Sequence, residues 1–127
     1  MEDNKTDVFL VQEAIQSHQL RVGLHVIDDG ERAIAFVDHL DRDPHAQAPK
    51  LFLLDLNLPR RSGCEVLARI RQSPKCAPVP VLIVTSSDLE KERALIAKLG
   101  ATGYFRKPAG YEAFLKIGNV IRKLLEA

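Results

Sequence analysis

The sequence has 127 residues and is poor in several features that define particular classes of protein. It has only two cysteines, Cys64 and Cys76, which form no C-x-x-C pair, so a disulfide framework is not expected and a reduced, cytoplasmic protein is indicated. No apolar run approaches the roughly 18 residues that a membrane span requires. The polar, acidic opening MEDNKTD has the character of neither a signal peptide nor an anchor.

An excess of charge of one sign is also missing. The chain has 18 basic and 17 acidic residues, which gives a net charge of +1. Broad electrostatic binding to nucleic acid or to a membrane is therefore not expected. Hydrophobic residues make up 46% of the chain and charged residues 28%, as in a soluble globular protein. The length predicts a single domain that spans residues 1–127.

Hydrophobic patterning predicts an alternation of helices and strands. Helices are expected at 6–19, 29–40, 63–73, 88–100 and 111–125, and strands at 22–28, 51–56, 81–85 and 102–106. LFLLDL and VLIVT are apolar on both faces, which is typical of parallel strands covered on both sides. One helix followed by four strand–helix units predicts an α/β fold, with helices on both faces of an open parallel sheet.

Chemically useful side chains follow the predicted strands. Asp55 ends one strand, Thr85 ends the next, and Lys107 follows the last. Glu2 and Asp3 immediately precede the first helix. Ligands of open α/β sheets collect at the carboxyl ends of the strands, so these residues are expected to converge on one edge.

This set fits phosphoryl transfer to a carboxylate. Asp55 can act as the nucleophile that carries an acyl phosphate. Mg²⁺ would offset the added negative charge, and its expected ligands are Glu2, Asp3, Asp55 and the backbone carbonyl of Asn57. Lys107 can pair with one phosphoryl oxygen, and Thr85 can donate a hydrogen bond to another.

Each of these residues also has an ordinary structural explanation. An aspartate after a buried strand usually enters a loop, and a threonine at a strand end is usually structural. A lysine before a proline is normally solvated, and an acidic pair near a helix start favours the helix dipole. Their convergence at the strand ends is what favours a functional site.

The chain resembles the receiver domain of two-component response regulators across nearly its whole length. The matching landmarks are Glu2 and Asp3, Asp55 in LLDLNLP, Thr85 in VLIVTSS, Tyr104 in ATGYFRKP, and Lys107 before Pro108. The DRDPHAQAP loop and the LLDLNLPRRSGCEVLARIRQ segment are similar to single-domain regulators paired with phytochrome-type histidine kinases.

The resemblance implies a flavodoxin-like, doubly wound sheet with strand order 2-1-3-4-5. It implies that a histidine kinase passes a phosphoryl group to Asp55 with Mg²⁺ as cofactor, and that the protein catalyses only its own phosphorylation and dephosphorylation. Thr85 and Lys107 would move toward the phosphoryl group, and the switch residue Tyr104 would follow inward. A cis Lys107–Pro108 peptide bond is also implied.

One feature departs from the family pattern. The family has an apolar strand before the acidic pair, whereas this sequence begins at Glu2 and Asp3, so the usual first strand is expected to be absent from the chain. An open slot in the sheet would leave buried backbone groups unpaired, at about 1–3 kcal/mol each. Upstream residues, a strand from another chain, or direct pairing of segments 23–27 and 51–55 could fill it, and upstream residues are favoured.

The main alternative is a degenerate receiver that acts as a protein-interaction module without phosphorylation. A haloacid-dehalogenase-type phosphatase needs a second carboxylate two residues after the nucleophile, where this chain has Asn57. A nucleotide-binding domain is not supported, because the chain has neither G-x-G-x-x-G nor G-x-x-x-x-G-K-[ST].

No output domain is expected after the last helix, so the signal would pass by protein contact or onward phosphotransfer. Self-association through the last strand and helix is also predicted, because that helix is rich in apolar residues, with core packing as the alternative. These residues are Tyr111, Phe114, Leu115, Ile117, Ile121, Leu124 and Leu125.

Overall fold

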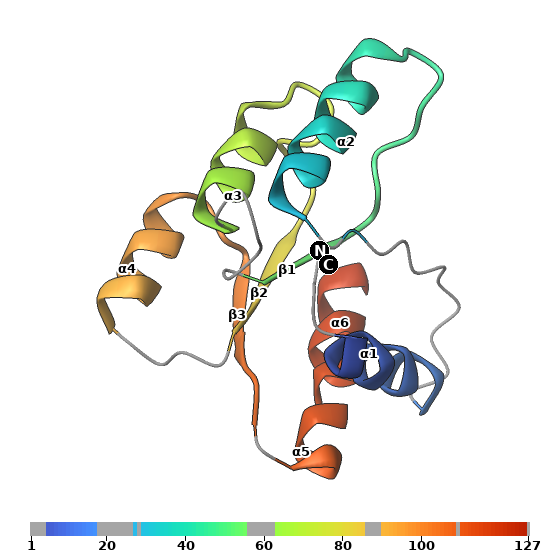
Figure 1. Cartoon of the computed structure of the whole chain (residues 1–127), viewed down its shortest axis with the longest axis vertical. Coiled ribbons are helices and arrows are strands. Elements are labelled where there is room, and N and C mark those ends of the chain that lie inside the picture. The colour runs from blue at the N-terminus through green and yellow to red at the C-terminus, as the bar shows by residue number, and fades with distance from the viewer. Residues whose placement is uncertain are drawn as a thin grey trace.

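The computed structural model describes residues 5–17, 27, 29–55, 63–85, 90–108 and 110–126. The elements within them are α1 (Lys5–Ser17), α2 (Gly30–Arg42), β1 (Phe52–Asp55), α3 (Gly63–Gln72), β2 (Val81–Thr85), α4 (Glu90–Lys98), β3 (Gly103–Arg106), α5 (Tyr111–Leu115) and α6 (Ile117–Glu126). The described strands form a parallel sheet of order β1-β2-β3 (Figure 1). The predicted strand–helix alternation is therefore confirmed from residue 30 onward.

Alternation along the strands gives the sheet two apolar faces. Leu54 and Ile83 belong to one buried cluster, which also contains side chains of α2 and α3. Leu82 and Val84 belong to a second cluster, with side chains of α1, α5 and α6. Figure 1 shows α2 and α3 together on one side of the sheet and α1, α5 and α6 together on the other. Every residue of β2 is buried, as expected for a strand covered on both faces.

Part of the predicted fold lies outside the described residues. Of the predicted strand 22–28, only Ile27 is described. Glu2 and Asp3 also lie outside the described residues, so the expected absence of a strand before the first helix stays a prediction. No helix in the described ranges is long and apolar enough to cross a membrane.

The predicted single helix at 111–125 is wrong in one respect, because it is divided into α5 and α6 at Lys116. The N–H of Lys116 donates to the carbonyl of Ala113, three residues back, which tightens the turn. The apolar pattern continues through this break, since Phe114 and Ile117 both pack in the same buried cluster.

The apolar residues of α5 and α6 are largely used within the chain. Phe114, Ile117 and Ile121 are buried, and three leucines pack partly buried against the same cluster: Leu115, Leu124 and Leu125. The surface that motivated the prediction of self-association is therefore mostly occupied, as in the core-packing alternative. Self-association itself stays a prediction.

Candidate functional site

Asp55 is the last residue of β1, where an apolar strand ends in a carboxylate. The strand before it is held by Phe52 and Leu54, which are both buried. Asp55 pairs in register with Val84 of the central strand, and its side chain is only 7% exposed. A carboxylate at such a position requires a compensating partner, because burial disfavours its ionised form.

Lys107 provides that partner. Its Nζ lies 2.8 Å from Oδ2 of Asp55, and its side chain is 13% exposed. Because β2 lies between β1 and β3, the Lys107 side chain spans the end of the central strand to reach Asp55. The prediction that the ammonium lies against Asp55 without a phosphoryl group is confirmed.

The backbone fixes Lys107 as well. Its N–H donates to the carbonyl oxygen of Thr85 at 2.7 Å, which continues the pairing of β2 with β3 by one step. Thr85 is fully buried and is the last residue of β2. The structure therefore brings the three predicted residues Asp55, Thr85 and Lys107 to the carboxyl edge of one sheet.

Tyr104 lies on the same face of the sheet as Thr85. It pairs in register with Ile83, which is two residues before Thr85. Because alternate side chains of a strand point to the same face, Ile83, Thr85 and Tyr104 lie on one face of the sheet. The ring is partly buried and packs against the cluster that contains Ile83. The guanidinium carbon of Arg93, on α4, lies 4.7 Å from the ring centroid.

One of the predicted metal ligands lies among the described residues. Of the four predicted ligand residues, Asp55 is described, whereas Glu2, Asp3 and Asn57 lie outside the described residues. Within the described ranges, no group of three or more His, Cys, Asp or Glu residues could hold a metal ion. The predicted donors are all oxygens, and the one that is described is a buried carboxylate, so the donor set fits Mg²⁺.

The expectation of a cis Lys107–Pro108 bond is wrong. The peptide bonds between described residues are all trans, including this one. A trans X-Pro bond is favoured by about 0.5–1 kcal/mol, and Lys107 reaches Asp55 in this arrangement.

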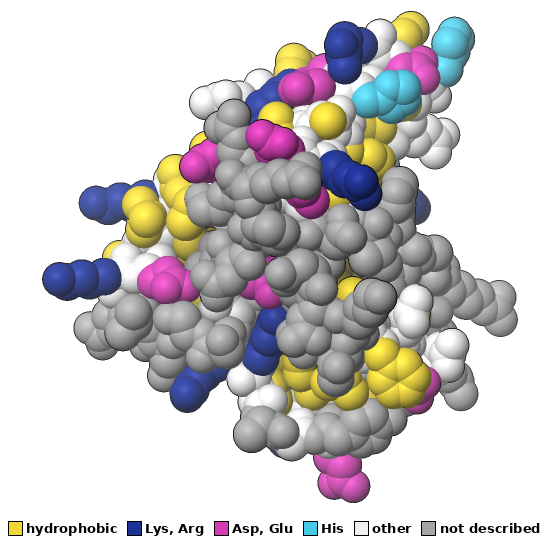
Figure 2. All heavy atoms as spheres, viewed as in Figure 1, with side chains coloured by type: hydrophobic (Ala, Val, Ile, Leu, Met, Phe, Trp, Pro, Cys, Tyr) yellow, Lys and Arg dark blue, Asp and Glu magenta, His cyan; other side chains and the backbone are white. Residues whose placement is uncertain are grey.

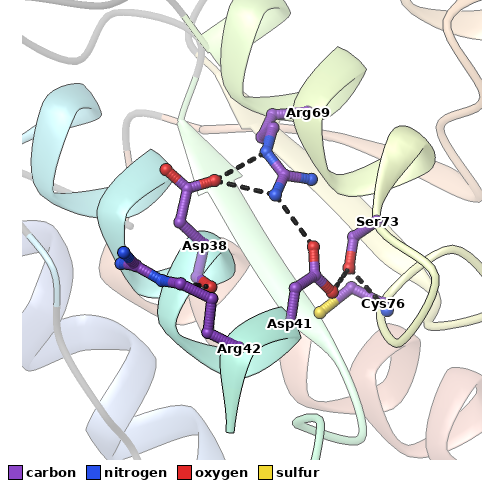
Figure 3. A network of polar contacts seen from close by, with 6 residues as sticks. All are labelled: Asp38, Asp41, Arg42, Arg69, Ser73 and Cys76. Atoms are coloured by element: carbon purple, nitrogen blue, oxygen red, sulfur yellow. Dashed lines mark hydrogen bonds and ion pairs between the residues drawn. The ribbon is translucent and has the colours of Figure 1, made fainter.

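A second polar cluster, which sequence patterns did not predict, joins α2 to α3 (Figure 3). Arg69 donates from Nε to Asp38 and from one terminal nitrogen to Asp41, both at 2.8 Å. The Ser73 hydroxyl donates to the other oxygen of Asp41 at 2.5 Å and accepts from the N–H of Cys76. The hydrogen bond from Ser73, then that from Arg69, lowers the pKa of the Asp41 carboxyl below its ordinary value.

Arg71, near the end of α3, forms a second junction. Its guanidinium donates to the carbonyls of Ala77, Val79 and Gly100 and to the hydroxyl of Thr102. Burial lowers the pKa of this guanidinium. Gly100 has a φ of +99°, a conformation that favours glycine, and a Cβ there would lie 3.0 Å from the Arg71 Nε, so the arginine side chain would have to shift.

Comparison with known proteins identifies relatives with one consistent description. Residues 1–118 match the family described as response regulator receiver domain. The response regulator Rcp1 of Synechocystis sp. (strain ATCC 27184 / PCC 6803 / Kazusa) is 34% identical over 117 residues, which span 92% of this chain and 80% of Rcp1.

Solved structures agree with this relationship. The phosphorylated cyanobacterial phytochrome response regulator RcpA superposes with a TM-score of 0.87 at 31% identity, covering 100% of this chain and 91% of RcpA. The Mn²⁺-bound form of Rcp1 gives a TM-score of 0.84 at 33% identity, covering 97% of this chain and 88% of that one.

Proposed function

Because this chain belongs to the response regulator receiver domain family, we propose that it receives a phosphoryl group on Asp55 from a partner histidine kinase and signals by a change of conformation. The observation that carries the proposal is the contact of the Asp55 carboxylate with the Lys107 ammonium at the carboxyl edge of the sheet. Asp55 is rigidly placed at the end of a buried strand, and the lysine has a flexible stem. This combination suits a nucleophile whose charged partner must change position.

In the proposed transfer, an oxygen of Asp55 attacks the phosphorus of a phosphohistidine. The new O–P bond forms as the N–P bond breaks, and the imidazole leaves with the electron pair. Glu2, Asp3, Asp55 and the Asn57 carbonyl would hold Mg²⁺, which offsets the negative charge around the phosphoryl group. Mn²⁺ bound to the relative Rcp1 supports the use of a divalent cation.

Lys107 stabilises Asp55 both before and after phosphorylation. Before transfer its ammonium offsets the Asp55 carboxylate at 2.8 Å. After transfer the same ammonium pairs with a phosphoryl oxygen, which requires only a rotation of its flexible side chain.

Thr85 and Tyr104 couple phosphorylation of Asp55 to a change in the surface of the protein. Thr85 donates its hydroxyl hydrogen to a phosphoryl oxygen and moves toward Asp55. Tyr104 follows inward along the face of the sheet that it shares with Thr85. The protein thus has two arrangements, and phosphorylation selects one of them.

The relatives also suggest the partner and the setting. RcpA is described as a cyanobacterial phytochrome response regulator, and its likeness to this chain supports a phytochrome-type histidine kinase as the phosphodonor. We propose that residues 1–127 form one receiver domain and that this domain acts in the cytoplasm. Catalysis is limited to the phosphorylation and dephosphorylation of the domain itself.

Intact-mass measurement after treatment with acetyl phosphate, with and without Mg²⁺, tests the proposal. We expect the mass of one phosphoryl group with Mg²⁺ and none in Asp55→Asn. Asp29→Asn is the matched control: Asp29 is also a buried aspartate, but it caps α2 by accepting from the N–H of Glu31 at 2.7 Å, and asparagine caps equally well. A protein that gains no mass under any condition is the degenerate receiver, and an Asp55→Asn protein that still gains it has another acceptor.

A further inference from the structure

The contact between Arg93 and Tyr104 joins α4 to the strand that carries the switch residue. The Arg93 guanidinium lies over the Tyr104 ring, 4.7 Å from its centroid, within the range of a cation–π interaction. Arg93 is exposed, whereas Tyr104 is partly buried. Basic side chains project over α4 at the left of Figure 2, and the exposed cations of that helix are Lys91, Arg93 and Lys98.

The Tyr104 ring therefore has two kinds of contact. It packs against the apolar cluster that contains Ile83, and it meets the Arg93 guanidinium. Movement toward Thr85 along the sheet retains apolar packing, because Ile83 and Thr85 are on the same face. The inward movement that we propose for Tyr104 would carry the ring from the exposed guanidinium on α4 toward Thr85, which is fully buried. The cation–π contact thus stabilises the outward arrangement selectively.

We propose that Arg93 is a positioning residue that holds Tyr104 outward and so sets how readily the unphosphorylated protein switches. This inference rests on the proposed function, since it assigns the regulation of the same site. A contact that forms in only one of two arrangements shifts the equilibrium toward that arrangement by the full free energy of the contact. An exposed cation–π contact corresponds to a change of about two- to fivefold in that ratio.

The ordinary alternative is that Arg93 only solvates the surface of α4. Lys91→Ala provides the matched control, because Lys91 is an exposed cation on the same helix, and its loss changes the net charge equally. Arg93→Lys retains the charge but replaces the planar guanidinium with an ammonium, which stacks less well on a ring. A solvating role predicts equal effects of Arg93→Ala and Lys91→Ala, whereas a positioning role predicts an effect of Arg93→Ala alone.

The first experiment measures the ring position without phosphorylation. The chain has no tryptophan and two tyrosines, so Tyr111→Phe leaves Tyr104 as the single tyrosine. In this background, we expect Arg93→Ala to increase the nuclear Overhauser contact between the Tyr104 ring and the Thr85 methyl group about two- to fivefold. Lys91→Ala is expected to leave the contact unchanged, and Arg93→Lys to be intermediate. An equal contact in Arg93→Ala and Lys91→Ala overturns the proposal.

The second experiment measures the rate of phosphorylation by acetyl phosphate with Mg²⁺. We expect Arg93→Ala to be about two- to fivefold faster than the parent and Lys91→Ala, and to lose this advantage when Tyr104 is replaced by leucine. If Arg93→Ala remains faster in Tyr104→Leu, the arginine does not act through the ring and the proposal fails. If no variant is phosphorylated, the proposed function fails, and the ring position in the first experiment still decides the role of Arg93. Arg93→Gln is the second variant, should alanine destabilise α4.

Discussion

The carboxyl edge of the parallel sheet, where the strands end, and the opposite edge, where the strands begin, hold nearby carboxylates in different ways. At the carboxyl edge, Asp55 meets the ammonium of Lys107. At the opposite edge, Asp41 meets the guanidinium of Arg69 and the hydroxyl of Ser73. A lysine is a compact charge on a flexible stem, whereas an arginine is a planar fork with fixed donor directions. The first kind of partner can follow a moving charge, and the second holds two elements in one relative position.

The opposite edge connects segments that are distant in the sequence. Arg69 joins α3 to α2, and Arg71 joins α3 to the segments that lead into β2 and β3. Lys75 donates to the carbonyls of Asp43 and Ala46 and so fixes the turn after α2. These contacts make the opposite edge a scaffold that joins α2, α3 and the segments that lead into β2 and β3.

Removal of the Arg71 guanidinium should have the largest effect on stability. Arg71→Ala leaves the carbonyls of Ala77, Val79 and Gly100 without this donor, which we expect to lower the free energy of unfolding by about 2–4 kcal/mol. Denaturant unfolding measures this change. Arg42→Ala is the control, because Arg42 is exposed and bonds only within its own helix among the described residues, and it should cost about 0.5 kcal/mol or less. Equal costs would show that the opposite edge is not a scaffold.

The two members of the Asp55–Lys107 pair should contribute unequally. Lys107→Met leaves the Asp55 carboxylate, 7% exposed, at the end of a rigid strand without its ammonium, and we expect a loss of about 1–3 kcal/mol in the free energy of unfolding. Asp55→Asn should cost less, because the stem of Lys107 allows its ammonium to reach water. Denaturant unfolding of both variants and of the double variant at neutral pH tests this order. A larger cost for Asp55→Asn would mean that the lysine, and not the aspartate, is the constrained member.

The smallest expected effect is a change in pH dependence at the opposite edge. Because the folded pKa of Asp41 is lowered, its ionised form contributes stability that is complete above the unfolded pKa, about 3.9, and is lost as the pH falls through the lower folded value. Thermal melts across acidic pH should therefore show a shallower loss of stability in Asp41→Asn. Ser73→Ala should remove part of the same slope, since the Ser73 hydroxyl is the largest cause of the shift. If both variants lose stability with falling pH as steeply as the parent protein, this account is contradicted.

Sequence patterns predicted the sheet and the three residues at its carboxyl edge because both depend on local signals. The strands VLIVT and LFLLD are continuous apolar runs, and parallel strands place their last residues at one edge. Asp55 and Lys107 could be paired in advance for this reason, although 52 residues separate them.

The polar scaffold could not be predicted in the same way. Arg69 and Asp41 are 28 residues apart, and neither lies at a strand end. Arginines in the last turn of a helix are common, so residue type alone does not single out Arg71. The break at Lys116 has no signal in the sequence, because the apolar spacing of the helix continues through it. These features follow from tertiary packing, which brings together side chains with no shared local pattern.

Lys107 is held twice within one residue, by its N–H to the Thr85 carbonyl at 2.7 Å and by its Nζ to Asp55 at 2.8 Å. A change in the charge at Asp55 would therefore change the electric field at a backbone hydrogen bond of the same residue that contacts it. We therefore expect the chemical shift of the Lys107 amide proton, and its exchange with solvent, to report phosphorylation of Asp55 without an added label. The residue that neutralises the site also makes its state observable.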